Sequence, residues 1–228
     1  MTRRYALYWL PAPGSGLAAF GNAVLGYDNA AGAPVPHPDG LGDLAAVTAG
    51  ARIYGFHATL KAPLRLAPAA EEADLLAMAR DLAAGHPPVA LGPLVVAALG
   101  PFLALVPEAP PPELGLLAAE CVAALDPLRS PLSEAERAKR RPERLDPRGR
   151  ALLARWGYPY VFEAFRFHMT LTDALPEPDR AVWLRRLTEA YAASRPAPAV
   201  IDAVCLLSQD GSAPFRLLAR LPFGGDHG

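Results

Sequence analysis

The sequence has few residues of several types, and each shortage excludes a class of protein. Cysteine occurs only at Cys121 and Cys205 in 228 residues. Two distant cysteines make neither a disulfide framework nor a zinc site, so we interpret both as buried free thiols. No apolar run approaches the ~18 residues of a membrane-spanning helix, and the apolar stretch near the N-terminus is too short for a signal peptide. The sequence therefore predicts a cytoplasmic protein.

An excess of charge of either sign is missing as well. The formal net charge is −1 and the pI is near 6.5, so no overall positive field attracts long nucleic acid or an anionic membrane. A small phosphorylated ligand is still compatible with this balance, because a local cluster of cations is enough to bind it. We expect a small phosphorylated substrate as partner, with neither a membrane nor long nucleic acid.

Several common site motifs are absent too. The sequence contains no glycine-rich phosphate loop, no H-x-H or H-E-x-x-H metal spacing and no serine nucleophile elbow. We therefore expect a site with no metal and no cofactor. Lysine is also rare, because 20 of the 22 basic residues are arginine and only Lys61 and Lys139 are lysine.

The hydrophobic pattern predicts an α+β protein. Period-two patterns predict strands, and amphipathic stretches that end at glycine or proline predict helices. The predicted strands cover residues 5–10, 53–62, 89–98, 102–106, 160–172, 199–208 and 215–221; the predicted helices cover residues 16–27, 69–84, 113–125 and 179–194. Ser133 and Glu136 form a capping-box pattern, which predicts the start of one more helix.

Two short segments repeat within this order of elements. HATL begins at His57 and HMTL at His168, and the Pro-Phe pairs at Pro101 and Pro214 follow at similar distances. This spacing indicates an internal duplication. We expect a single bilobal domain over residues 1–228, with lobes over about 1–100 and 101–228 and a basic helical connector over about 129–155. The fold would contain two mostly antiparallel sheets, related by a pseudo-two-fold around a central cleft.

Alternation within the two segments identifies candidate site residues. In residues 165–172 every second side chain is polar, and residues 55–61 repeat the pattern, so each strand places a histidine and a threonine on one face. Each predicted face also carries a cation, two residues after the threonine in the first strand and two residues before the histidine in the second. These residues are His57, Thr59 and Lys61 in the first strand, and Arg166, His168 and Thr170 in the second.

This set of residue types suits phosphate chemistry. Histidine titrates near neutral pH and can act as a general acid or base. Hydroxyl groups and cations can hold the non-bridging oxygens. We therefore predict that His57 and His168 are catalytic, and that Thr59, Thr170, Lys61 and Arg166 bind phosphate. Which histidine is the acid stays open.

The two motifs resemble those of a known superfamily. HATL and HMTL are similar to the paired H-x-T motifs of the 2H phosphoesterases. The context YGFHATLKAP, WGYPYVF (residues 156–162) and FRFHMTLT resembles more specifically the DUF1045-like branch found beside bacterial phosphonate-degradation genes, over nearly the whole chain. The resemblance implies a bilobal fold, both His-Thr pairs in one cleft, and metal-independent hydrolysis of a small cyclic phosphodiester. The association with phosphonate degradation suggests a ribose cyclic phosphate as substrate.

Other residues are weaker candidates. Tyr158 and Tyr160 precede the second motif and could stack on a base or sugar, although packing explains them equally well. Tyr5 is a further substrate-contact candidate, but Tyr5 and Tyr8 alternate, so at most one faces the cleft. His37, His86 and His227 lack a threonine partner and are interpreted as surface residues. The basic residues 137–155 fit a solvated connector, with a lid or clamp as the alternative.

Two other functions stay open at this stage. The same cleft could hold a nucleotide or sugar phosphate without turnover, as a binding module. It could also process RNA 2′,3′-cyclic-phosphate ends, although the near-neutral charge disfavours long RNA.

Overall fold

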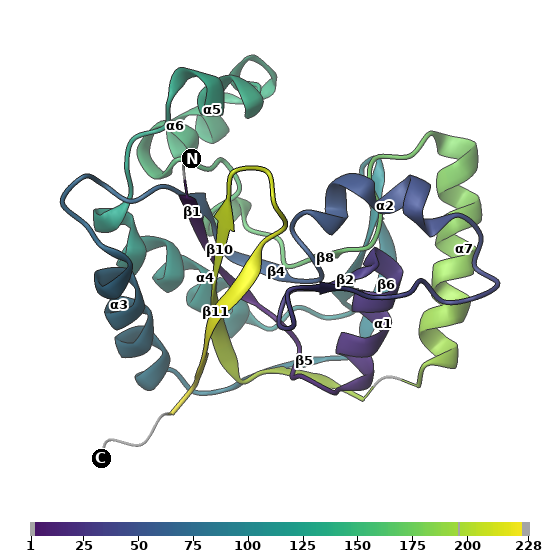
Figure 1. Cartoon of the computed structure of the whole chain (residues 1–228). Coiled ribbons are helices and arrows are strands. Elements are labelled where there is room, and N and C mark those ends of the chain that lie inside the picture. The colour runs from purple at the N-terminus through teal and green to yellow at the C-terminus, as the bar shows by residue number, and fades with distance from the viewer. Residues whose placement is uncertain (1–2, 196, 225–228) are drawn as a thin grey trace.

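One seven-stranded antiparallel sheet forms the centre of the molecule (Figure 1). The computed structural model describes residues 3–195 and 197–224. The strand order is β11-β10-β1-β4-β8-β7-β6, and two small sheets pair β2 with β3 and β5 with β9. The strands are β1 (Arg3–Trp9), β2 (Tyr27–Asp28), β3 (Ala33–Pro34), β4 (Ala58–Leu64), β5 (Val89–Gly92), β6 (Leu94–Leu99), β7 (Phe102–Pro107), β8 (Met169–Thr170), β9 (Ala199–Ile201), β10 (Ala203–Asp210) and β11 (Arg216–Pro222).

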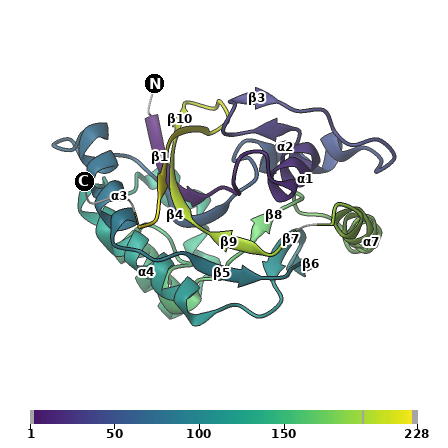
Figure 2. The same cartoon turned by 90° about the horizontal axis from the view of Figure 1, so that it is seen from below.

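Helices cover the sheet from several sides. They are α1 (Gly16–Leu25), α2 (Leu44–Arg52), α3 (Glu72–Ala84), α4 (Pro112–Leu125), α5 (Glu134–Lys139), α6 (Pro147–Trp156) and α7 (Glu177–Ala193), with short 3₁₀ turns η1 (Asp126–Leu128), η2 (Pro142–Arg144) and η3 (Phe162–Ala164). Helices α3 and α4 lie side by side, whereas α7 lies at the opposite end of the molecule and packs on β6 and β7 (Figure 2). This arrangement confirms the predicted α+β class.

The sheet is continuous where two separate sheets were predicted. The two motif strands, β4 and β8, are direct neighbours, so the strands on either side of them join one sheet. A repeat would equate β5 with β9, β6 with β10 and β7 with β11. Two of these pairs agree with the strand order: β5 and β9 pair with each other, and β6 and β10 are each the third strand counted from the β4–β8 junction. The last strands do not follow it, because β7 lies beside β8 while β11 is an edge strand. The duplication stays a prediction, and the expectation of two sheets was wrong.

Several element boundaries also differ from the prediction. Gly55 adopts a left-handed conformation, so β4 starts only at Ala58. The predicted strand 89–98 breaks at Gly92-Pro93 into β5 and β6, which belong to different sheets. Residues 160–172 form ladder pairs only over Met169–Thr170. Helix α2 was missed, although its cap is ordinary: the Asp43 side chain accepts a hydrogen bond from the Ala46 N–H.

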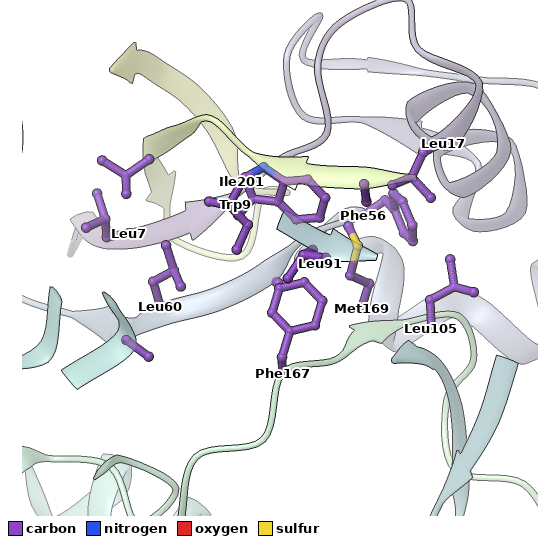
Figure 3. Close-up of a cluster of buried hydrophobic side chains, with 14 of the residues drawn as sticks. Leu7, Trp9, Leu17, Phe56, Leu60, Leu91, Leu105, Phe167, Met169 and Ile201 are labelled. Carbon is purple, nitrogen blue, oxygen red and sulfur yellow. The ribbon is translucent and has the colours of Figure 1, made fainter. Parts of the chain in front are cut away.

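The main hydrophobic core fixes the residues beside both motif histidines. Phe56 and Ala58 flank His57, Phe167 and Met169 flank His168, and all four side chains are buried in the same cluster. Figure 3 shows Phe56, Phe167 and Met169 in this cluster. Burying a side chain such as Phe or Met contributes about 1.5–3 kcal/mol. Because side chains alternate along extended backbone, this burial turns both imidazoles to the opposite face.

Close packing at Gly21 of α1 supports the first motif. A Cβ atom at this position would overlap the ring of Phe56. We predict that Gly21→Ala lowers the free energy of unfolding by roughly 1–3 kcal/mol, because overpacking a filled core forces strain. The matched control is Gly115→Ala in α4, where a Cβ meets open space and the better helix propensity should raise stability by up to about 1 kcal/mol. Equal effects of the two substitutions in urea unfolding would contradict this packing.

Candidate functional site

The pairing of β4 with β8 brings the two motifs together. Ala58 pairs with Met169 in an antiparallel register. In such a register the residues before and after the pair cross over, so His57 lies across from Thr170 and Thr59 lies across from His168. The four polar side chains thus occupy one small area of the sheet, as the alternation in the sequence required.

All four side chains line one cavity of about 410 Å³. We call it the cleft. Its floor is β1, β4 and β8, and its wall includes the end of α2. Its lining comprises Arg4, Tyr8, Gly50, Ala51, Tyr54, His57, Thr59, Ala62, Pro63, Phe102, Arg140, Tyr158, His168, Thr170, Thr172, Asp173 and Ala174.

Both imidazoles are held in the same way. The Nδ1 atom of His57 is 2.8 Å from the carbonyl oxygen of Gly55, and that of His168 is 2.8 Å from the carbonyl oxygen of Arg166. A carbonyl oxygen can only accept, so each Nδ1 carries the hydrogen and Nε2 is left for other partners. In His57, Nε2 lies 3.1 Å from the Thr59 hydroxyl, which donates to it.

The surroundings keep His57 uncharged at neutral pH. The ring is buried and stacks on Tyr8, with the two centroids 3.8 Å apart. Burial lowers the pKa of His57 to about 4, against a smaller opposing effect of the Gly55 hydrogen bond and a further lowering by His168. A neutral imidazole whose Nε2 carries no hydrogen is a proton acceptor, and in this site that lone pair receives the Thr59 hydroxyl.

The turn before His57 depends on glycine. Gly55 has φ of +69°, and a Cβ there would overlap the Asn29 side chain. Asn29 is buried and donates hydrogen bonds to the carbonyl oxygens of Tyr54 (3.0 Å) and Phe215 (2.8 Å). The Asn29 side chain therefore fixes the turn, and the turn directs the Gly55 carbonyl oxygen at the imidazole of His57.

Three charged residues of the cleft were not among the predicted site residues, although one of them, Arg140, lies in the basic segment 137–155 for which a lid or clamp was the alternative. Arg4 comes from β1, Arg140 follows α5, and Asp173 follows β8. The Asp173 carboxylate accepts hydrogen bonds from the backbone N–H groups of Gly50 (2.8 Å) and Ala51 (2.7 Å), which ties α2 to the site. Only the position of Asp173 directly after the HMTLT segment could have identified it.

The predicted tyrosine and arginine contacts are spread over two hollows. A second hollow of about 700 Å³ adjoins the cleft and shares His168, Thr59 and Tyr158 with it. Tyr160 and Arg166 line this second hollow and do not line the cleft. Tyr158 and Tyr160 contact each other edge to face, 5.5 Å between centroids. Tyr5 faces the main core instead and its hydroxyl donates to Glu72 (3.0 Å), so Tyr8 is the tyrosine of β1 that faces the cleft.

Lys61 does not share the face of His57 and Thr59. Thr59 pairs with Tyr8 of β1, but the next partner of β1, Leu7, pairs with Lys61, so Leu60 is an extra residue in a β-bulge. A bulge reverses the alternation, which places Lys61 on the same side as Leu7. There its ammonium group donates to the carbonyl oxygen of Val122 (2.9 Å) and to Asp126 (3.0 Å). The prediction of a phosphate-binding face for Lys61 was wrong for this reason.

Lys61 belongs instead to a buried cluster of charges. Asp126 binds Lys61, Arg129 (2.9 Å) and Arg155 (2.7 Å), and its side chain is 9% exposed. Burial lowers the pKa of Lys61, and Asp126 opposes that change. Burial alone would raise the pKa of Asp126, but hydrogen bonds from Arg129, Lys61 and Arg155 together lower it. The cluster links β4 to η1 and α6.

The remaining histidines lie outside the cleft. His37 is half-buried, with Nδ1 3.0 Å from the Ala23 carbonyl oxygen and Nε2 2.9 Å from Arg52. The His86 side chain is 12% exposed and packs on Phe223. Both are therefore more enclosed than predicted, and His227 lies outside the described residues. Within residues 3–195 and 197–224, no three His, Cys, Asp or Glu side chains gather as a metal site would require, and no helix is long and apolar enough to cross a membrane.

The protein is thus of the α+β class, with an antiparallel sheet that carries two His-Thr pairs in one cleft. Residues 59–216 match the family described as "Protein of unknown function (DUF1045)", and the chain belongs to that family. The resemblance to the DUF1045-like branch is thereby confirmed.

Two curated relatives are similar over almost the whole chain. A "Ribose 1,5-bisphosphate phosphokinase PhnN" of Janthinobacterium sp. (strain Marseille) is 45% identical over 97% of this chain and 51% of its own length. A protein of the same name from Laribacter hongkongensis (strain HLHK9) is 38% identical over 94% of this chain and 50% of its own length. The chain thus spans about half the length of these relatives.

The relatives' names require one correction. Both are named as kinases, which conflicts with the predicted metal-independent hydrolysis of a cyclic phosphodiester. The expectation of a 2H-type hydrolase, and with it the ribose cyclic phosphate as substrate, is withdrawn on this finding. The H-x-T motifs led to it because imidazole and hydroxyl groups suit many reactions at phosphorus, and the residue types alone do not distinguish them.

The charge cluster around Asp126 predicts a large effect on stability. Asp126→Asn leaves Lys61 buried beside two arginines without a counter-charge, so we expect the free energy of unfolding to fall by about 3 kcal/mol or more. The control is Glu163→Gln, which removes the exposed partner of Arg148 and should cost at most about 1 kcal/mol. Urea unfolding compares them, and a loss in Asp126→Asn no greater than in the control would refute the role of the cluster.

The lowered pKa of His57 predicts a pH dependence. Between pH 6.5, the ordinary pKa of histidine, and about pH 4, the unfolded chain binds a proton at His57 that the folded protein does not bind. The free energy of unfolding is therefore highest above about pH 7 and decreases as the pH falls. At pH 5 the loss from His57 is about 2 kcal/mol, since one pKa unit corresponds to ~1.36 kcal/mol. Unfolding of the wild type and His57→Gln at pH 7.5 and pH 5 should show a smaller loss in the variant. Parallel losses would mean that burial does not perturb this imidazole.

Proposed function

We propose that the cleft binds a phosphorylated ribose, with one phosphoryl group held between the two His-Thr pairs. The observation that carries this proposal is the pairing of β4 with β8, which places four phosphate-compatible side chains on the floor of the cleft. The names of the relatives support ribose as the sugar, since both contain ribose 1,5-bisphosphate.

The imidazoles have a second role in this proposal, as proton-transfer groups. A negative phosphoryl group beside an imidazole favours its charged form, so ligand binding and protonation are coupled. Before the ligand binds, His57 is neutral and its Nε2 accepts a hydrogen bond from the Thr59 hydroxyl. A hydroxyl group of the sugar can replace Thr59 as the donor to this lone pair, which makes His57 the group that accepts from the sugar. His168 is the second proton-transfer group, on the opposite strand of the pair.

The relatives' reaction concerns proteins about twice as long as this chain. A G-x-x-x-x-G-K-[ST] segment, which holds nucleotide phosphates in many kinases, does not occur in this sequence. The proposal therefore places the sugar phosphate here and assigns no nucleotide to the cleft. A kinship of fold with the 2H phosphoesterases, including a duplicated bilobal origin, is also proposed. This kinship rests on the two adjacent H-x-T strands, and we do not infer a hydrolytic reaction from it.

Titration calorimetry with ribose 5-phosphate tests this function. Each of His57→Gln, His168→Gln, Thr59→Val and Thr170→Val should weaken binding about tenfold or more, because a hydrogen bond to a charged group is worth about 1.5–3 kcal/mol. The control is His86→Gln, which removes a histidine outside the cleft and should change affinity less than about twofold. No binding by the wild type, or binding that survives all four cleft substitutions, would refute the proposal.

A further inference from the structure

The charge of the cleft is not balanced by its own residues. Arg4, Arg140 and Asp173 are the charged side chains in its lining, apart from the titratable histidines and tyrosines. Asp173 already accepts two backbone hydrogen bonds from α2, whereas no described carboxylate forms an ion pair with either arginine. The cleft therefore presents two guanidinium groups that have no anionic partner within the described residues.

Arg140 is held in place by an aromatic ring. It follows α5 in the basic connector and is half-buried. Its guanidinium group lies 4.9 Å from the ring centroid of Tyr158, which also lines the cleft. A cation above an aromatic face is oriented by that contact while its N–H donors stay available. In Figure 1, α5 and α6 lie beyond the N-terminal end of β1, which carries Arg4.

Arg4 enters the lining of the cleft from the sheet. It shares a face of β1 with Tyr8, and the two Cα atoms lie four residues or about 13 Å apart along the strand. The Arg4 Nε (3.0 Å) and Nη2 both donate to the side-chain oxygen of the buried Gln209, a neutral partner that fixes the side chain, leaves its charge uncompensated and leaves Nη1 for a ligand. Because Tyr8 stacks on His57, this arginine end is separate from the His-Thr centre.

We propose that Arg4 and Arg140 form a second anion-binding subsite, which takes the second phosphoryl group of a bisphosphorylated sugar. This inference rests on the proposed function, since the first phosphoryl group occupies the His-Thr centre. Planar guanidinium groups suit phosphate because they donate two parallel hydrogen bonds to it. One arginine comes from the rigid sheet and the other from the connector, so a bisphosphate bridges the two parts of the chain that line the cleft.

The experiment compares a monophosphate with a bisphosphate. Titration calorimetry measures ribose 5-phosphate and ribose 1,5-bisphosphate binding to the full chain, Arg140→Gln and Lys139→Gln. Lys139 is the neighbouring cation of α5, is exposed and does not line the cleft, so it controls for net charge. Thermal unfolding of each variant verifies that the fold is retained.

The wild type should bind the bisphosphate at least tenfold more tightly than the monophosphate. Arg140→Gln should reduce this preference to about twofold or less and leave monophosphate affinity nearly unchanged, whereas Lys139→Gln should keep the preference. A wild type without preference, an Arg140→Gln variant that keeps it, or equal losses in both variants would overturn the second subsite. If monophosphate binding still depends on the His-Thr pairs, the proposed function survives that result; if the wild type binds neither sugar, both proposals fail.

Discussion

The site depends on one backbone pairing, that of Ala58 in β4 with Met169 in β8. These two short strands come from distant parts of the chain, and their pairing merges the strands on either side into one sheet. The buried neighbours Phe56 and Phe167 fix the face of each strand from the core side. With both faces fixed, the two imidazoles can point only into the shared cleft. The pairing therefore determines the fold and the chemistry together.

Polarity differs along the cleft, and this difference gives the protein its proposed selectivity. At the centre, the buried imidazole of His57 stays neutral at pH 7 and bonds to Thr59. At one end, Arg4 and Arg140 supply two guanidinium groups, and that of Arg140 lies over the ring of Tyr158. A neutral centre with a cationic end favours ligands that bring their own negative charge and hydroxyl groups. A phosphorylated sugar has both, which is why the near-zero net charge of the chain does not oppose its binding.

The sequence was sufficient to predict features that follow from alternation along extended backbone. The directions of the His57 and His168 side chains are of this kind, and β8 shows that alternation persists even where almost no ladder forms. Features set by tertiary contacts were missed. The bulge at Leu60 places Lys61 on the other face of the sheet, and no local sequence pattern predicts this bulge. Arg140 reaches the cleft through the tertiary position of the basic segment 137–155. The charge of that segment allowed a lid or clamp as an alternative, but no spacing in the sequence singled out Arg140.

The most direct test is a measurement of the imidazole nitrogens by NMR on protein with ¹⁵N-labelled histidine, assigned with His57→Gln and His168→Gln. We predict a protonated Nδ1 in both residues, an unprotonated Nε2 in His57 at neutral pH, and a response of both rings to ribose 5-phosphate. A hydrogen on Nε2 of His57 in place of Nδ1, or a response of only one ring to the ligand, would contradict a shared site between the two strands.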